Sequence, residues 1–162
     1  MIGSKNWAAW WRRFLDISPD GYHEALEILR GRYIEERQHA MRFTQHARSM
    51  QYPQFRDRLL QIASEEANHA EWIAKEIRQL GGTLPEVPAV PVTEKNSWEY
   101  LLADLDEEMR CADEVLEQIQ TIQSEFPQVA ELLERIRGDG EKHRDAIREM
   151  LMKSDPQALW PA

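Results

Sequence analysis

The chain has 162 residues, of which 30% are charged, a net charge of −9 and a single cysteine, Cys111. This length predicts one domain, spanning residues 1–162, with a substantial core. The negative charge, without any basic cluster, argues against nucleic acid and membrane partners. One cysteine excludes an intrachain disulfide and a cysteine-ligated iron–sulfur centre. No apolar run could span a bilayer and the first residues lack a signal-peptide pattern, so we expect a cytoplasmic protein.

Helical periodicity runs through most of the chain. A tryptophan-rich segment, residues 5–16, is predicted as a short helix that docks against the rest of the fold or a second subunit, with a membrane-surface position as the alternative. Four longer segments, rich in Glu, Leu, Arg, Ala and Gln, are predicted as helices at 20–50, 54–80, 97–123 and 127–152. No segment has a strand pattern, so the predicted class is all-α.

The connections between the four long helices predict their arrangement. The breaks near residues 51–53 and 124–127 are short, so each joins antiparallel neighbours. Residues 81–96 form a proline-containing loop, which in extended form reaches about 45 Å. A helix of this length measures about 42 Å, so the loop can run along the whole of it. The sequence therefore predicts a four-helix bundle made of two antiparallel hairpins joined by a long crossover.

Charged and imidazole side chains interrupt the apolar stripes of these helices. They are Glu36, Glu66, Glu108, His69 and His143. Glu36 and Glu66 are equidistant from the first turn, and Glu108 and position 140 are equidistant from the second. Each of these four positions lies about 22 Å from its turn, so all four lie at the same depth in the bundle. Burying a lone carboxylate is very costly unless it is paired or binds a metal. Pairing with an arginine would explain any single Glu, but all five side chains together predict a buried metal site of the di-iron or di-manganese carboxylate type.

Four segments resemble the ligand-bearing helices of the ferritin-like superfamily, particularly its rubrerythrin-like and bacterioferritin-like branches. They are "EERQHAMRFTQHA", "EEANHAEWIAKEIRQLGGTLP", "DLDEEMRCADEVL" and "GDGEKHRDAI", within residues 22–152. The resemblance implies a ferritin-like bundle and a homodimer. It also implies terminal ligands Glu36 and Glu108, a bridging Glu66, and histidine ligands His69 and His143. We expect two iron ions, with one ion, manganese or zinc as alternatives. The chain has no rubredoxin module, and its tail after residue 152 is too short for the fifth helix of an iron-storing ferritin.

Gly140 stands where the resemblance places a second bridging Glu. Three consequences are open: a water, hydroxide or exogenous carboxylate fills the position, Asp139 swings in, or only one ion binds. His39, three residues after Glu36, is a further substitute ligand, although we interpret it as an ordinary histidine beside the stripe. Gly138 and Gly140 together are expected to distort their helix locally.

These residues predict a metal-binding redox protein, ferroxidase-like or peroxidase-like, that reacts with dioxygen or peroxide and takes electrons from an external donor. The alternative is a non-catalytic helical bundle with a degenerate or one-ion site that acts in protein interaction. Gly140 favours the alternative, and the five converging ligands favour the redox protein. The sequence does not identify the physiological substrate.

Overall fold

A computed structural model of the chain describes residues 17–93 and 95–154, which contain four α-helices and no β-strand. The helices are α2 (Pro19–Arg48), α3 (Pro53–Gln79), α4 (Ser97–Ile122) and α5 (Pro127–Lys153). The predicted all-α class is therefore confirmed. The helix predicted at residues 5–16 lies outside the described residues. Within them, no helix is long and apolar enough to cross a membrane.

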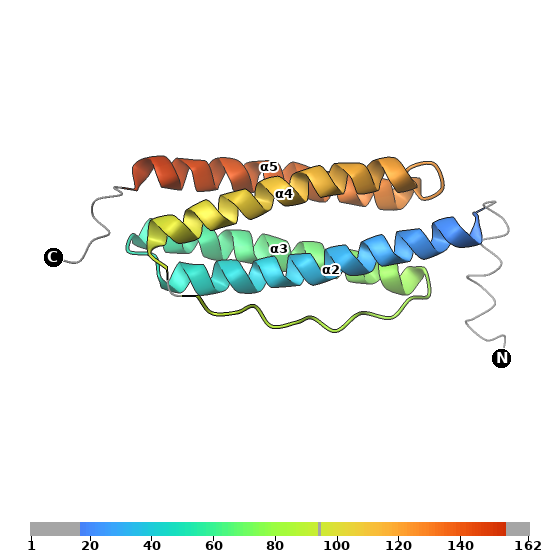
Figure 1. Ribbon diagram of the computed structural model, residues 1–162, viewed down its shortest axis with the longest axis horizontal. Coiled ribbons are helices and arrows are strands. Elements are labelled where there is room, and N and C mark those ends of the chain that lie inside the picture. The colour runs from blue at the N-terminus through green and yellow to red at the C-terminus, as the bar shows by residue number, and fades with distance from the viewer. Residues whose placement is uncertain (1–16, 94, 155–162) are drawn as a thin grey trace.

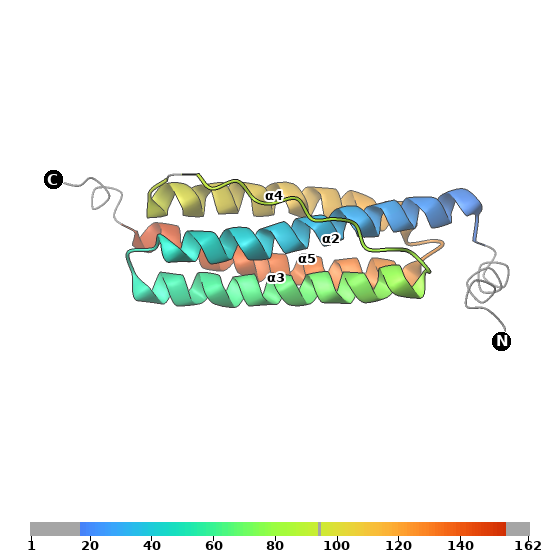
Figure 2. The same ribbon diagram turned by 90° about the horizontal axis from the view of Figure 1, so that it is seen from below.

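The helices form two antiparallel hairpins, α2 with α3 and α4 with α5, and each helix packs most extensively on its hairpin partner (Figures 1 and 2). The connection from α3 to α4 runs along the outside of the bundle from one end to the other. This confirms the predicted long crossover. The two hairpins therefore lie side by side, with the inner faces of all four helices turned toward a common axis.

Local sequence signals fix the helix ends. Pro53 and Pro127 occupy first-turn positions of α3 and α5, where a missing backbone N–H is tolerated. Asn96 and Glu99 form a reciprocal capping box at the start of α4. Gly81 follows α3 with a φ of 79°, a left-handed conformation that glycine adopts without steric cost. These signals set where the crossover leaves and re-enters the bundle.

A polar layer divides the apolar core into two clusters. One cluster includes Leu29, Ile73 and Leu133, and the other includes Phe43, Ile62 and Ile147. On every helix the buried polar residues lie between the parts of the helix that belong to these two clusters. The buried polar side chains at this depth are Arg32, Glu36, His39, Glu66, His69, Glu108 and His143. Because an unpaired buried charge is very unfavourable, this layer is the feature of the fold that needs a functional explanation.

Candidate metal centre

One short sequence pattern recurs at the middle of all four helices. The four copies are "EERQH" (35–39), "EEANH" (65–69), "EEMRC" (107–111) and "DGEKH" (139–143). Each begins with an acidic residue, continues with Glu or Gly, and ends with His or Cys. Residues i and i+3 share a helix face, so the second and fifth positions point to the same region. The repeat is the sequence signal that identifies His39 and Cys111 as members of the polar layer.

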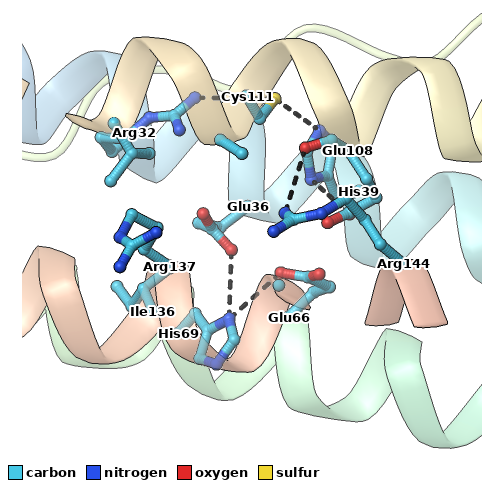
Figure 3. Close-up of a pocket in the computed structure, with 13 residues that line it drawn as sticks. Arg32, Glu36, His39, Glu66, His69, Glu108, Cys111, Ile136, Arg137 and Arg144 are labelled. Atoms are coloured by element: carbon cyan, nitrogen blue, oxygen red, sulfur yellow. Dashed lines mark hydrogen bonds and ion pairs between the residues drawn. The ribbon is translucent and has the colours of Figure 1, made fainter. Parts of the chain in front are cut away.

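Three inner carboxylates converge near the bundle axis (Figure 3). Glu36, Glu66 and Glu108 are 4%, 3% and 5% exposed. His69 Nδ1 lies 3.3 Å from Glu36 Oε2 and 3.2 Å from Glu66 Oε2. One ligand atom from each of Glu36, Glu66 and His69 lies within 4.8 Å of the others, a spacing at which one metal ion can be held. The structure thus brings together the ligands expected on the first hairpin.

A second group shares Glu66 with the first. His39 Nδ1 lies 3.6 Å from Glu108 Oε1, and ligand atoms of His39, Glu66 and Glu108 are all within 4.8 Å of one another. His39 is therefore a buried member of the layer, in contrast to our interpretation of it as an ordinary histidine beside the stripe. Glu66 is therefore the residue that the two groups share.

His143 reaches the same carboxylate from α5. Its Nδ1 lies 2.8 Å from Glu66 Oε1, and its side chain is fully buried. In the part of the chain that is described, however, His143 is in none of the three-residue groups with metal-binding spacing. All five expected ligands lie in one layer, and two histidines, His39 and His143, approach the carboxylates Glu66 and Glu108.

Outer carboxylates contact the far nitrogens of the histidines. His143 Nε2 lies 2.8 Å from Glu65 Oε2, and His69 Nε2 lies 3.2 Å from Asp139 Oδ2. Carboxylates at this position orient metal-binding imidazoles and increase their basicity. Asp139 swinging in was one of three open possibilities for the missing inner ligand. In the structure Asp139 lies on the outer side of His69, where Lys142 Nζ also contacts it at 2.7 Å.

The pKa values of the side chains in the polar layer are shifted, so that several of them carry protons when no metal is bound. Burial and the charge of Glu66 raise the pKa of Glu36 to about 8, and the same causes raise the pKa of Glu108 to about 7. Burial would lower the pKa of His69, but Glu36 and Glu66 raise it to about 10. Burial opposes the charge on Glu66, yet hydrogen bonds from Glu36, His143 and His69 hold its pKa well below the ordinary value. A metal ion must displace these protons.

Three buried ligand atoms are only weakly satisfied in the metal-free protein, which fits a metal. Glu36 Oε2, Glu108 Oε1 and His143 Nδ1 make no hydrogen bond of good geometry, although each faces another layer residue: His69 Nδ1 at 3.3 Å, His39 Nδ1 at 3.6 Å and Glu66 Oε1 at 2.8 Å. A cation near the axis would give all three atoms a closer partner. Oxygen and imidazole donors in this ratio suit iron or manganese, and also zinc.

Arg144 lies beside the position where a fourth inner carboxylate is missing. A Cβ on Gly140 would lie 3.5 Å from one guanidinium nitrogen of Arg144 and 3.5 Å from Glu108 Oε2. A cavity of about 30 Å³ opens here between the inner residues, with room for a molecule the size of water. The expected distortion of α5 is absent, since the α-helix is continuous through Gly138 and Gly140.

Comparison with known proteins agrees with this fold. The profile of the ferritin-like domain family matches residues 45–155. The structure resembles a bacterioferritin from Desulfovibrio desulfuricans, described as showing its diiron site in different catalytic states, with a TM-score of 0.76. The likeness covers 82% of this chain and 81% of that chain at 21% sequence identity, and it shows the fold alone. No curated protein matches the sequence. The extent of the profile match establishes that the chain belongs to the ferritin-like domain family.

Proposed function

We propose that this protein is a metal-dependent redox protein whose carboxylate centre holds two iron or manganese ions and reacts with dioxygen or peroxide. The observation that carries the proposal is the convergence of three buried carboxylates and three buried histidines in one layer of the bundle. Glu36 and His69 would hold one ion and Glu108 the other, with His39 or His143 as its histidine. Glu66 would bridge them. When bound, these ions supply the electron transfer to the oxidant.

The residues around the centre supply proton handling and orientation. In the metal-free protein at neutral pH, Glu36 is mostly protonated because its pKa is about 8, and Glu108 is about half protonated because its pKa is about 7. Both would release their protons as metal enters and are positioned to take up protons again when the charge of the centre changes. Glu65 and Asp139 hold His143 and His69 in one orientation through their outer nitrogens. The apolar clusters on either side exclude bulk water.

The open position beside Gly140 suits a small oxidant. A cavity of about 30 Å³ lies between the inner ligands and Gly140, with room for a species the size of water. Gly140 leaves this position free of a protein ligand, and the guanidinium of Arg144 lies next to it. We infer that the oxidant enters here, and that the electrons come from an external donor. A homodimer would be the assembly by analogy with the family.

The experiment that tests the proposal is anaerobic loading of the metal-free protein with ferrous iron, followed by exposure to air or peroxide. We expect about two equivalents of iron per chain and consumption of oxidant with a change in optical absorbance. The Glu66→Gln protein, which keeps the shape of the side chain, should bind little iron and consume no oxidant. Iron binding without oxidant consumption would refute the redox function while leaving the metal site intact.

The charge of Arg144 favours a second candidate function. The negative charges of the three inner carboxylates equal the positive charges of one divalent ion and Arg144 taken together. With two divalent ions, positive charge would be left uncompensated. A one-ion, structural site in a bundle that acts in protein interaction would fit this balance. An anomalous-scattering map distinguishes the two, because the redox proposal requires two ions on either side of Glu66 and the alternative requires one.

A further inference from the structure

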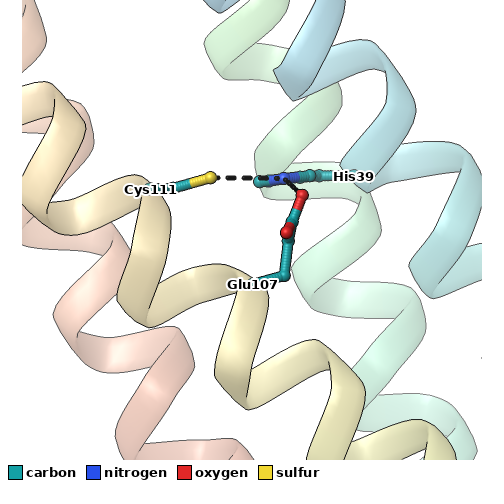
Figure 4. A group of neighbouring side chains, drawn as sticks. All are labelled: His39, Glu107 and Cys111. Atoms are coloured by element: carbon teal, nitrogen blue, oxygen red, sulfur yellow. Dashed lines mark hydrogen bonds and ion pairs between the residues drawn. The ribbon is translucent and has the colours of Figure 1, made fainter.

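A second cluster of metal-binding side chains lies between α2 and α4, on the outer side of His39 (Figure 4). It contains His39 from α2 and two residues one turn apart on α4, Glu107 and Cys111. His39 and Cys111 are buried, and the side chain of Glu107 is 26% exposed. The cluster therefore has two buried donors and one donor at the solvent boundary, through which an ion could enter.

Two of the donor separations in this cluster are close to those of a tetrahedral site. Cys111 Sγ lies 3.7 Å from His39 Nε2, and Glu107 Oε1 lies 3.7 Å from the same nitrogen. All three donor atoms lie within 4.8 Å of one another. In tetrahedral zinc sites, bond lengths of about 2.0–2.3 Å place sulfur and nitrogen donors about 3.6 Å apart and nitrogen and oxygen donors about 3.4 Å apart. Both separations measured from His39 Nε2 are within about 0.3 Å of that geometry.

The kind of donor selects the metal. A sulfur, an imidazole nitrogen and a carboxylate oxygen are typical zinc ligands, and three protein ligands with a fourth position for water form an open zinc site. The central layer differs because its donors are oxygen and nitrogen alone, which suits iron or manganese. We propose that His39, Glu107 and Cys111 bind one zinc ion at the α2–α4 interface, separate from the central carboxylates.

Neighbouring arginines hold the ligands of the cluster in place. Arg110 donates to Glu107 through Nε at 3.1 Å and through a terminal nitrogen at 2.9 Å. Arg110 and Arg32 also approach Cys111 Sγ, at 3.6 and 3.9 Å, and can compensate the charge of a metal-bound thiolate. Their own positive charges are already paired, Arg110 with Glu114 and Arg32 with Glu35. These partners reduce the repulsion that a zinc ion would otherwise experience.

His39 links the zinc site to the central layer. If Nε2 binds zinc, the ring proton resides on Nδ1, which faces Glu108 Oε1 at 3.6 Å. In that state His39 donates toward Glu108 instead of binding a central ion, and His143 remains the histidine of the second central position. The zinc site needs no metal in the centre, so it can be tested whether or not the proposed redox function is correct.

Cobalt(II) tests the site because a bound thiolate gives it a strong near-ultraviolet charge-transfer band. We expect one equivalent of Co²⁺ to produce this band in the metal-free full chain, and excess Zn²⁺ to abolish it. The band should persist in the Glu36→Gln/Glu66→Gln protein, in which the centre is disabled. Glu107→Gln should weaken binding about 10-fold or more. The exposed control Glu117→Gln, on the same helix, should leave it unchanged.

Two outcomes would overturn the zinc site. One is the absence of the band in a protein that circular dichroism shows to be folded. The other is zinc affinity, measured with a chromophoric competitor, that is the same in Cys111→Ser as in the original chain. If Cys111→Ser fails to fold, the rate at which Cys111 is alkylated in the original chain, with and without zinc, tests the site instead. Zinc should then slow alkylation of Cys111 about 10-fold, and less in Glu107→Gln, while equal rates with and without zinc would refute the site.

Discussion

Glu66 is the residue on which the central layer depends. Its Oε2 faces His69 and its Oε1 faces His143, and it is the shared member of both central groups. We expect Glu66→Gln to lower the affinity for iron or manganese by more than about 100-fold, because the amide keeps the shape but cannot bridge two cations. A metal-binding titration measures the loss. Glu71→Gln, at an exposed position of the same helix, should behave like the original chain. Equal losses in the two variants would contradict the role of Glu66.

Asp139 tests whether the outer carboxylates matter. It lies 3.2 Å from His69 Nε2, on the side of the ring opposite Glu36 and Glu66. Asp139→Asn should lower metal affinity about 10-fold to 100-fold by weakening the orientation and basicity of His69. The matched control is Asp145→Asn on the exposed face of α5. If Asp139→Asn abolished binding as completely as Glu66→Gln does, Asp139 would be an inner ligand instead.

At the scale of single elements, Gly140 on α5 leaves one position beside the central carboxylates without a side chain. A Cβ at this position would make ordinary contacts, with the nearest atoms 3.5 Å away. Gly140→Glu should supply a fourth inner carboxylate, tighten binding of the second ion by about 10-fold and slow the reaction with oxidant by occupying the open position. Isothermal titration and oxidant consumption measure the two effects.

Gly138 provides the control for this substitution. Apart from its chain neighbours and the backbone of its own helix, no atom lies within 4 Å of the position that its Cβ would take. Gly138→Glu should share the gain in helix stability, about 1 kcal/mol or less, without changing metal affinity. Identical metal binding by the two glutamate variants would mean that position 140 does not face the ions.

A buried hydrogen-bonded pair, His46 and Asp104, joins α2 to α4 outside the central polar layer. His46 Nδ1 lies 2.8 Å from Asp104 Oδ1, and Asp104 is 1% exposed. Removing one partner leaves the other buried and unpaired, so Asp104→Ala should lower the free energy of unfolding by about 3 kcal/mol. Urea denaturation measures the change. Asp106→Ala, exposed on the same helix, should change it by less than about 0.5 kcal/mol. A comparable loss in both variants would show that the pair contributes little.

At the scale of the whole molecule, the buried protons link stability to pH. Folding raises the pKa of Glu36 from 4.5 to about 8 and that of His69 from 6.5 to about 10. Stability from such groups is complete below the unfolded pKa and is lost as pH rises through the folded pKa. The free energy of unfolding of the metal-free protein should therefore fall between neutral pH and pH 10. Urea denaturation at a series of pH values measures this.

Metal loading should remove that pH dependence. Divalent ions replace the protons on Glu36 and His69, so the loaded protein should keep its stability over the same interval and melt at a higher temperature than the metal-free protein. Glu36→Gln, in the metal-free form, should show a shallower decline because one of the titrating groups is gone. A metal-free protein whose stability rises from neutral pH to pH 10 would contradict the proposed proton-filled layer.

The fold was predictable because its signals are local. Apolar spacing gave four helices, and proline, glycine and capping residues marked their ends. A crossover long enough to pass along a helix selected the two-hairpin arrangement. The depth of Glu36, Glu66 and Glu108 followed from equal distances to the turns, since an antiparallel hairpin aligns residues by counting from its turn. Only chain geometry enters these inferences.

The inner contacts depended on tertiary structure. The sequence placed Glu66 and His69 on one face of α3, but the rotation of each helix about its axis brought His39 inward and paired His46 with Asp104. Which histidine nitrogen faces a carboxylate is decided by packing on several helices at once. Spacing along one chain segment therefore determined the helices and the depth of the polar layer, whereas side-chain directions across the bundle axis, which no single segment encodes, decided the arrangement of its ligands.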